Sequence, residues 1–479
     1  MDGLLTELAR LFSQEGYTLY GVGGMVRNPL MGLPVSDIDV CSAMKPDDVE
    51  TLCRKHGLKT VDKGRAFGMI EIHIGQGDQR LFVEHTTFRS DTYAFGGHRP
   101  DGVRFSTSIE EDAFRRDFSV NAIYKNILTG ELVDPTEGLT DLKRGMLRTA
   151  CADPDSTLRD DGLRIMRLAR FACELGLSVD PATLASAKKH CDLLLDISAE
   201  RLWTELSRLL LSDIRYPEVQ KKRFCDETDS GEKLPWDNSV FFGLELLRET
   251  GALFALIPEL RAADGFVQRT KYHRYDVLGH SIRTCACTPA SLALRLAGLL
   301  HDVSKPEAFE RDGNMYAHPM LGTGKTREIL TRLRCPNDTA DTVCGFVKEH
   351  MYDLNNTAKD STIKKRFAML GRTFASGLIE IRNADIHGSG VELGRIPQVD
   401  RWRAILAQME SDGTPMSVNE LNCTGADIME WTKLPPSPAV GKLKNALFMH
   451  CAVKPKDNNP KRLKKLCADL YTRSKNDSI

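Results

Sequence analysis

The sequence has no long apolar run, almost no excess of charge of either sign, and no closely spaced set of cysteines. No stretch approaches the ~18 consecutive apolar residues of a membrane-spanning helix, so we expect no membrane partner. The formal net charge of −1 gives no global attraction to nucleic acid, and RNA binding would need local basic surfaces. The closest cysteine pair, Cys285 and Cys287, has neither zinc nor disulfide spacing. We therefore expect most of the cysteines to be buried thiols in a reducing cytoplasm.

Hydrophobic periodicity divides the 479 residues into an α/β head and a helical remainder. At ~100–200 residues per domain, the length predicts three or four units. Residues 1–150 begin with an amphipathic helix and contain strand-like runs at 17–20, 36–40, 68–74 and 80–87. From residue 155 the period becomes helical, interrupted by polar stretches at 212–240 and 355–360. We therefore predict an α+β fold, with a mixed sheet and helices in the head and an all-α remainder.

A glycine turn begins the first candidate site. Gly23 and Gly24 follow a strand-like run and open a helical pattern, and glycine allows both positive φ and close approach to a ligand. Free N–H groups at a helix start favour a phosphate. Arg27, one turn further along, could add a charge-assisted hydrogen bond. A purely structural turn is the alternative.

Two aspartates follow the glycine turn. Asp37 and Asp39 stand two residues apart in a predicted strand, so both side chains should point to the same face. Adjacent carboxylates repel each other, and a divalent cation relieves that repulsion. Mg²⁺ suits oxygen ligands and keeps positions for water and substrate phosphates. The alternative is a solvated strand face, where two such aspartates are common.

Arginines dominate two further segments. Arg115, Arg116 and Asp117 are consecutive, and the planar, permanently charged guanidinium pairs bidentately with phosphate. Asp117 could orient an arginine, bind ribose hydroxyls or assist the metal ions. The alternative is a basic surface turn with an internal ion pair.

The second arginine-rich segment contains an acceptor and a donor at helical spacing. On a helix, Asp161 and Arg164 would be i, i+3 neighbours. Together they could accept from the exocyclic amine of cytosine or adenine and donate to the adjacent ring nitrogen, which disfavours guanine and uracil. Arg167 and Arg170 continue the same helical side. The alternative is a salt-bridged helix in which Asp160 and Asp161 pair with Arg164.

The order of these motifs resembles class II CCA-adding enzymes and bacterial poly(A) polymerases, within the nucleotidyltransferase β superfamily. The chain reads G-G-x-V-R, D-x-D, R-R-D and D-D-x-x-R. It departs from the family pattern at Asn28, where the family usually has aspartate, and at Asp160, where it has glutamate. Residues 87–100 resemble the loop with which full CCA-adding enzymes switch from CTP to ATP. Residues 197–201 match the neck pattern I-S-x-E-R, which we assign to helix packing with an internal ion pair.

The resemblance implies Mg²⁺-dependent, template-independent addition of CCA to tRNA from CTP and ATP, with release of pyrophosphate. A poly(A) polymerase or an A-adding enzyme shares the motifs and stays an alternative. The implied catalytic residues are Asp37, Asp39 and Asp117, with Mg²⁺ on the first two. The implied nucleotide-binding residues are Gly23, Gly24, Arg27, Arg116, Asp161, Arg164, Arg167 and Arg170.

A second group of metal-ligand residue types lies downstream and resembles an HD-type phosphohydrolase domain. Imidazole and carboxylate together suit a transition metal or Mg²⁺, which could activate water for phosphoester hydrolysis. The candidate ligands of this second divalent metal are His280, His301, Asp302 and Asp385, with His318 and His350 as further candidates. Either the site is a metal-dependent phosphohydrolase or phosphodiesterase, or the fold serves only to support tRNA.

The resemblance extends over nearly the whole chain and predicts five regions. These are a nucleotidyltransferase head at 1–150, a helical neck with the nucleobase-selecting motif at 151–215, a body or insertion at 216–265, an HD-type helical domain at 266–395, and a helical tRNA-binding tail at 396–479. The oligomeric state stays open.

Overall fold

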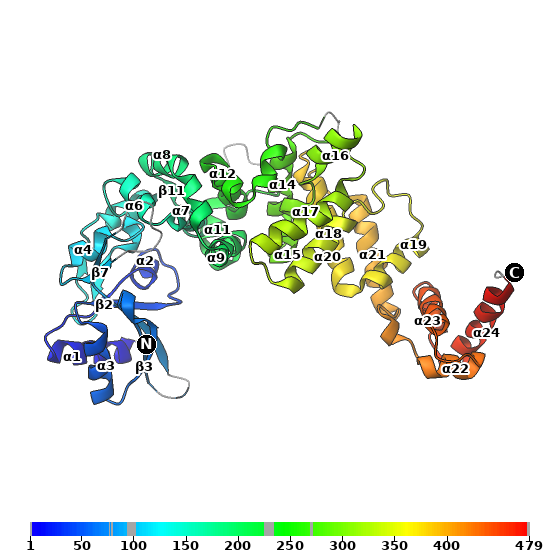
Figure 1. The fold of residues 1–479 in the computed structure, drawn as a ribbon, viewed down its shortest axis with the longest axis horizontal. Coiled ribbons are helices and arrows are strands. Elements are labelled where there is room, and N and C mark those ends of the chain that lie inside the picture. Colours follow the sequence, from blue (N-terminus) through cyan, green and yellow to red (C-terminus); the bar gives the residue numbers. More distant parts are fainter. Residues whose placement is uncertain are drawn as a thin grey trace. The chain divides into compact units, whose positions relative to one another are not determined.

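The computed structural model describes residues 2–75, 77, 80–92, 102–224, 234–268 and 272–476. The chain forms two compact units. The first comprises Met1–Lys233 and Asp237–Arg261, and the second comprises Leu234–Trp236 and Ala262–Ile479. The predicted α+β class is confirmed, with a mixed sheet in the head followed by helices (Figure 1).

A seven-stranded sheet with the order β3-β4-β5-β2-β1-β8-β9 forms the centre of the head. Only β2 and β5 run parallel, and the other neighbours are antiparallel. The strands are β1 (Tyr20–Gly21), β2 (Ile38–Ser42), β3 (Lys59–Gly64), β4 (Met69–Ile74), β5 (Leu81–Thr87), β8 (Tyr124–Asn126) and β9 (Leu132–Val133). The predictions at 68–74 and 80–87 are confirmed. β2 begins at Ile38, so Asp37 precedes the strand instead of lying within it.

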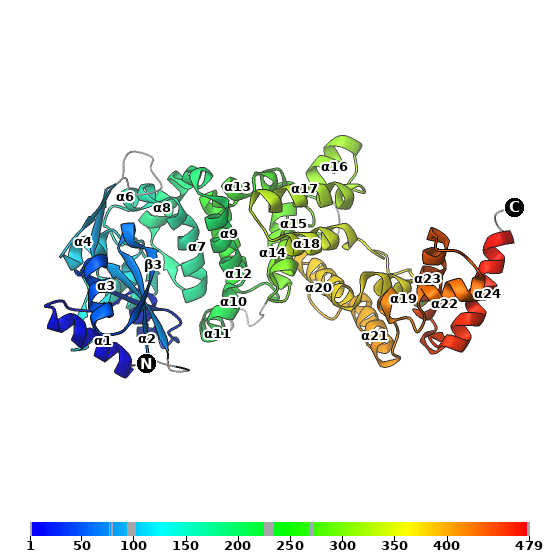
Figure 2. The ribbon, with the colours of Figure 1, turned by 60° about the horizontal axis from the view of Figure 1, so that its bottom comes forward.

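Helices α1 (Asp2–Gln14) and α3 (Pro46–Lys55) pack on one face of this sheet (Figure 2). The buried core there includes Phe12 of α1, Val40 of β2 and Val83 of β5. Because side chains alternate along a strand, Asp39 and Glu84 project from the opposite face. The apolar alternation of β2 and β5 thus fixes where the carboxylates point.

The rest of the first unit is mainly helical. Its helices are α2 (Gly24–Leu30), α4 (Ile109–Phe114), α5 (Gly138–Arg144), α6 (Pro154–Asp160), α7 (Leu163–Leu175), α8 (Pro181–Lys189), α9 (Ala199–Leu210), α10 (Ser212–Arg215), α11 (Pro217–Phe224), α12 (Ser239–Thr250) and α13 (Ala252–Leu256). Two small sheets join β6 (Arg89–Thr92) to β7 (Gly102–Phe105) and β10 (Met146–Leu147) to β11 (Ser178–Val179). The polar stretch at 212–240 was predicted to interrupt the helices, but it begins with the short helices α10 and α11. Its acidic part at 225–233 lies outside the described residues.

The second unit consists of helices. They are α14 (Val277–Cys287), α15 (Leu292–Leu300), α16 (Lys305–Asp312), α17 (His318–Arg332), α18 (Asn337–Glu349), α19 (Asp360–Leu370), α20 (Arg372–Gly388), α21 (Pro397–Ser411), α22 (Gly425–Thr432), α23 (Pro438–Cys451) and α24 (Pro460–Asn476). Helix α14 packs against α15 and α20, and α22–α24 pack on one another (Figure 1). Within the described ranges, no helix has both the length and the apolar character needed to cross a membrane.

Candidate active site

A cleft of about 720 Å³ in the first unit collects most of the predicted residues of the head and neck. Its walls come from the start of α2, the start of β2, the segment after α4, and helices α7, α9 and α10. Nine of the predicted residues line it, namely Gly23, Gly24, Arg27, Asp37, Asp39, Arg116, Asp117, Arg167 and Arg170. Asp161 and Arg164 are not among the lining residues.

Carboxylates gather at one end of the cleft. Asp39 of β2 pairs in register with Glu84 of the parallel strand β5, and Asp37 is an exposed neighbour. Burial raises the pKa of Asp39 to about 6, and the nearby carboxylates of Glu84 and Asp37 add to the rise. A divalent cation fits this oxygen-rich group because it offsets the repulsion that raises the pKa.

Sequence reasoning missed Glu84. Its signal was a charged residue in an otherwise alternating strand-like run, but the pairing of β5 with β2 could not be read from the sequence. The parallel register supplies that information, because it brings residues 45 positions apart in the chain side by side.

Gly23 is required where it stands. Its φ is 64°, in the region that favours glycine. A Cβ there would lie 3.4 Å from Asp39 Oδ2, an ordinary contact distance. The positive φ, and not crowding, therefore favours glycine in this turn beside Asp39.

Arg27 is buried and held by two neutral amides. Its Nε and Nη2 donate to Asn28 Oδ1 at 3.1 and 2.7 Å, and its Nη1 donates to Asn121 Oδ1. Asn28, the departure from the family's aspartate, donates to Pro34 O and Tyr216 Oη at 2.9 Å each. Because neither amide is charged, they orient the guanidinium without neutralising it.

Asp112 orients the arginines of the R-R-D motif. One of its oxygens accepts from Arg115, and the other accepts from Arg116 and from the hydroxyl of Tyr124. Burial alone would raise the pKa of Asp112, but Arg116 and Arg115 outweigh it and hold the pKa below its usual range. Arg116 lines the cleft, so this fully buried aspartate fixes the position of a guanidinium group there.

Asp117, predicted as catalytic, has both oxygens occupied. Oδ2 accepts from Nε and Nη2 of Arg167 at 2.9 and 2.7 Å, and Oδ1 accepts from Asn121 at 3.0 Å. Burial would raise its pKa, but Arg167 and Asn121 lower it below the usual range. The sequence allowed three roles for Asp117. These contacts match the one in which it orients an arginine.

Phe171 gathers three guanidinium groups. The Cζ of Arg170 lies 4.0 Å from its ring centroid, and those of Arg27 and Arg167 lie 5.1 Å from it. Arg170 also pairs with Glu174 and Glu205. Cation–π contact stabilises these neighbouring positive groups in the cleft. This role of Phe171 could not be predicted from local sequence patterns.

The prediction that Asp161 and Arg164 share one helix is wrong. Asp161 has extended backbone, with φ −150° and ψ 105°, between α6 and α7. Its Oδ2 pairs with Arg201 at 2.8 Å. Arg164 donates to Thr157 O and Arg115 O at 2.9 and 2.6 Å. The two side chains are therefore held by other groups, and Arg201 of the neck pattern has a partner outside that pattern.

Most of the predicted CTP-to-ATP switching loop at 87–100 lies outside the described residues. Only its first part is described, as β6 (Arg89–Thr92). Its proposed role stays a prediction.

Comparison with known proteins places this geometry in a family. Residues 19–148 match the model described as the poly A polymerase head domain, and 176–217 match the probable RNA and SrmB-binding site of polymerase A. An A-adding tRNA nucleotidyltransferase of Deinococcus radiodurans is 31% identical over 445 residues, covering 89% of each chain. The chain belongs to the class II tRNA nucleotidyltransferase and poly(A) polymerase family.

Other members of the nucleotidyltransferase family match over a shorter part of the chain or with lower sequence identity. A CCA-adding enzyme of Levilactobacillus brevis is 39% identical over 197 residues, or 41% of this chain and 47% of the relative. The chain thus spans about half the length of several curated relatives that it matches. The crystal structure of the Bacillus stearothermophilus CCA-adding enzyme in complex with CTP superposes with a TM-score of 0.70 and 25% identity, covering 99% of this chain and 98% of that one.

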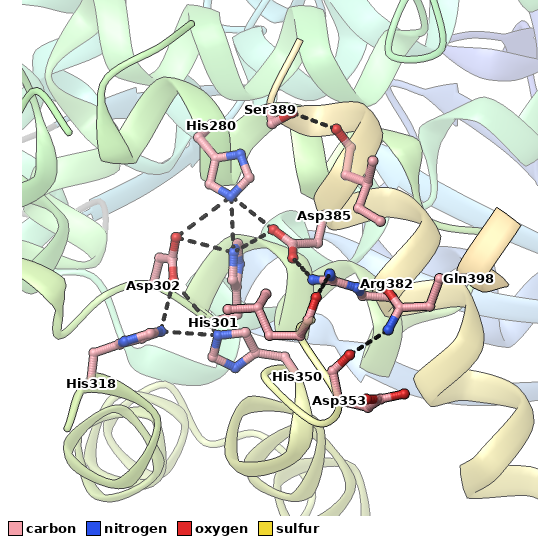
Figure 3. A network of polar contacts seen from close by, with 12 residues as sticks. His280, His301, Asp302, His318, His350, Asp353, Arg382, Asp385, Ser389 and Gln398 are labelled. Atoms are coloured by element: carbon pink, nitrogen blue, oxygen red, sulfur yellow. Dashed lines mark hydrogen bonds and ion pairs between the residues drawn. The ribbon is translucent and has the colours of Figure 1, made fainter. Parts of the chain in front are cut away.

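A second cluster of predicted residues lies in the second unit. The structure brings His280, His301 and Asp385 together, and separately Asp302, His318 and His350. All four principal candidates and both further candidates are therefore neighbours (Figure 3).

Proposed function

We propose that the chain adds or repairs the 3′-terminal CCA of tRNA, using CTP and ATP without a nucleic-acid template and releasing pyrophosphate. The observation that carries the proposal is the cleft in which the carboxylates Asp37 and Asp39 face Arg27, Arg116 and Arg167. Carboxylates that can hold metal ions opposite fixed guanidinium groups are what phosphoryl transfer needs, because its catalysis is mostly positioning and charge stabilisation.

Asp37 and Asp39, supported by Glu84, would hold Mg²⁺, which lowers the cost of ionising the attacking 3′ hydroxyl and stabilises the leaving pyrophosphate. Arg27 and Arg116 bind triphosphate oxygens. Asp117 keeps Arg167 pointed into the cleft. Gly23 lets the backbone at the start of α2 approach the phosphates closely.

Asp161 and Arg164 select the base in this proposal. Two of the five guanidinium donors of Arg164 hold it to backbone carbonyls, so the remaining donors can address a ring nitrogen from a fixed position. The Asp161–Arg201 pair is partly exposed, with side-chain exposures of 20% and 43%. Such a pair stabilises little, so Asp161 can exchange Arg201 for the exocyclic amine of cytosine or adenine.

We place this activity in the cytoplasm. The twelve cysteines in the described part of the chain are free thiols, nine of them buried, which matches a reducing compartment. The helical body would bind tRNA mainly through its shape and backbone.

An A-adding enzyme is the second candidate. A relative that matches 89% of both chains carries that name, and a CCA-adding enzyme of Geobacillus thermodenitrificans matches 92% of this chain and 90% of its own length, so coverage does not separate the two activities. Both activities use the same head motifs, so only the products separate them.

Primer extension distinguishes these functions. tRNA transcripts ending before CCA, after C and after CC would each receive CTP, ATP or both. Extension of every primer to CCA supports the proposal, and extension of the CC primer alone supports A addition. An open-ended A tail would assign a poly(A) polymerase. Asp37→Ala/Asp39→Ala should abolish extension, whereas the exposed Asp48→Ala should not. Lack of extension by the unmodified protein would overturn the transferase proposal.

A further inference from the structure

One wall of the active-site cleft holds none of the residues assigned to the triphosphate or to the base. Its residues all line the cleft and lie at helical spacing across the junction of α9 and α10, namely Ser207, Arg208, Leu211, Ile214 and Arg215. Intervals of one, four, seven and eight residues place side chains on one side of a helical path. We call this set the α9–α10 wall.

The α9–α10 wall combines positive charge with apolar surface. Arg208 is exposed, and its side chain has no ion-pair partner among the described residues. Arg215 is 45% exposed, and Ile214 beside it is 56% exposed. Exposed cations beside apolar surface suit an RNA strand, which presents an anionic backbone and the flat faces of its bases.

Arg215 reaches the outer carboxylate of the cleft. One of its Nη atoms donates to Ser36 Oγ at 2.7 Å and lies 3.8 Å from Asp37 Oδ2. The hydroxyl of Ser36 donates to the same oxygen of Asp37 at 2.8 Å. The α9–α10 wall therefore lies directly beside Asp37.

The two carboxylates of the cleft have different cationic neighbours. Cβ atoms placed at the two glycines of the turn would lie 3.4 Å from Asp39 Oδ2 and 3.7 Å from Arg27 Nη2, so Asp39 and Arg27 both flank the start of α2. Burial raises the pKa of Asp39, and Arg116 and Arg27 both act to lower it. Asp37 has Arg215 instead. The cleft thus has one cationic side at Asp39 and another at Asp37.

In-line transfer needs both cationic sides. The attacking and leaving oxygens lie on opposite sides of the transferred phosphorus. In the proposed function the triphosphate lies against Arg27 and Arg116, so the attacking 3′ oxygen of the RNA approaches from the side of Asp37. The phosphate that joins the last two nucleotides lies only one sugar away from that 3′ oxygen. It therefore comes within reach of Arg215.

We propose that the α9–α10 wall binds the 3′ end of the acceptor RNA, with Arg215 on the phosphate between the last two nucleotides and Ile214 against the terminal nucleotide. Arg208 supplies a further positive charge to the backbone. A planar guanidinium can bind phosphate through two parallel hydrogen bonds, so Arg215 orients the RNA end as well as holding it. The inference rests on the proposed function, because only an enzyme that extends RNA needs this site.

The contact between Arg215 and Asp37 is compatible with this role. Both side chains are largely exposed, at 45% and 75%, and exposed ion pairs stabilise little. The Cζ of Arg215 lies 5.5 Å from the ring of Tyr216, whose hydroxyl accepts from Asn28 at 2.9 Å. Arg215 can therefore exchange a carboxylate for a phosphate while its side chain stays against a fixed ring.

A double-mutant cycle between protein and RNA tests the contact. A tRNA ending in CC would carry either the natural phosphate or a neutral methylphosphonate between its last two nucleotides. Fluorescence anisotropy without nucleotide would measure its binding to the full-length protein. The neutral linkage should raise the Kd of the unmodified protein about tenfold, as expected for loss of a hydrogen bond to a charged group. In Arg215→Gln, which itself should bind the natural RNA about tenfold more weakly, the neutral linkage should add less than about twofold.

Kinetics separate RNA binding from nucleotide binding. Arg215→Gln should raise the KM for tRNA about tenfold and leave the KM for ATP unchanged, a split that general loss of structure would not produce. Ile214→Ser should raise the KM for tRNA and keep full sensitivity to the methylphosphonate. Arg223→Gln is the matched control, because Arg223 of α11 is exposed, does not line the cleft and donates to Ser178 Oγ. It should behave like the unmodified protein.

Two results would overturn the assignment of Arg215. Equal sensitivity of the unmodified protein and Arg215→Gln to the methylphosphonate would show that Arg215 does not hold this phosphate. A raised KM for ATP with an unchanged KM for tRNA would assign Arg215 to the triphosphate. Lack of extension by the unmodified protein would overturn the transferase proposal instead. The binding comparison needs no extension and therefore tests the α9–α10 wall independently.

Discussion

Asn28 Oδ1 accepts two hydrogen bonds from the guanidinium of Arg27, at 3.1 and 2.7 Å, at the position where the sequence departs from the expected family pattern. The amide of Asn28 simultaneously donates to Pro34 O and Tyr216 Oη. All its hydrogen-bonding capacity is therefore used, and the departure at this position belongs to a complete local network.

Asn28→Asp should weaken both folding and nucleotide binding. The carboxylate cannot donate to Pro34 O, and a buried carbonyl without a partner costs about 1–3 kcal/mol. The new negative charge would also offset part of the positive charge that Arg27 presents to triphosphate. We expect a lower free energy of unfolding in urea and a higher KM for CTP and ATP. An unchanged KM would show that the charge of Arg27 does not act on the nucleotide.

Asp39 should make stability fall as pH rises. Its pKa of about 6 in the folded protein lies above the usual value of ~3.9. In the interval between these values the folded protein binds more protons than the unfolded chain, so raising the pH through it costs up to about 3 kcal/mol. Asp39→Asn should remove this slope in the presence of a chelator and should abolish nucleotidyl transfer.

Urea unfolding at pH 4 and pH 7.5, which bracket the interval between the two pKa values, measures the difference. Asp48→Asn is the matched control, because Asp48 is exposed and is not among the groups that raise the pKa of Asp39, so its loss should leave the slope intact. Equal slopes in the unmodified protein and Asp39→Asn would contradict the assignment to Asp39.

Glu84→Gln tests the carboxylate that sequence reasoning missed. Glu84 contributes to the raised pKa of Asp39, so its neutralisation should shift the acid limb of kcat/KM to lower pH. The same substitution should weaken Mg²⁺ binding, because it removes a nearby negative charge. Glu71→Gln is the control, since Glu71 is the neighbour of Glu84 on β4 and already pairs with His73 and Lys63. An unmoved acid limb in Glu84→Gln would exclude Glu84 from the site.

Local patterns predicted the parts of the active site that are close together in the chain. The glycine turn and the Asp37–Asp39 pair could be placed because strand alternation and turn chemistry act over a few residues. Glu84 could not be identified, because it joins the site only through the parallel register of β2 and β5. The same limit applies to Glu205, which reaches Arg170 from another helix.

In the neck, the residue spacing is that of one helix, but the structure has two helices, α6 and α7. Asp161 and Arg164 have helical spacing, but Gly162 separates α6 from α7, and a Cβ at that glycine would lie 2.8 Å from Leu193 Cβ. Close packing against Leu193, and not local helix propensity, therefore requires glycine at position 162, where one helix ends and the next begins. Sequence spacing alone contains no information on that contact.

Substitution of Arg201, the ion-pair partner of Asp161, distinguishes base selection by Asp161 from a purely structural role. If the Asp161–Arg201 pair only stabilises the neck, Asp161→Ala and Arg201→Ala should have equal effects. If Asp161 reads the base, Asp161→Ala should admit GTP and UTP, whereas Arg201→Ala frees the carboxylate and should keep the preference for CTP and ATP. Loss of one base-directed hydrogen bond is worth about 1–3 kcal/mol, or roughly 5- to 150-fold in discrimination. Competition between CTP and UTP on a tRNA lacking CCA measures it. Equal discrimination in both variants would assign Asp161 to the neck's structure and remove it from the recognition of the base.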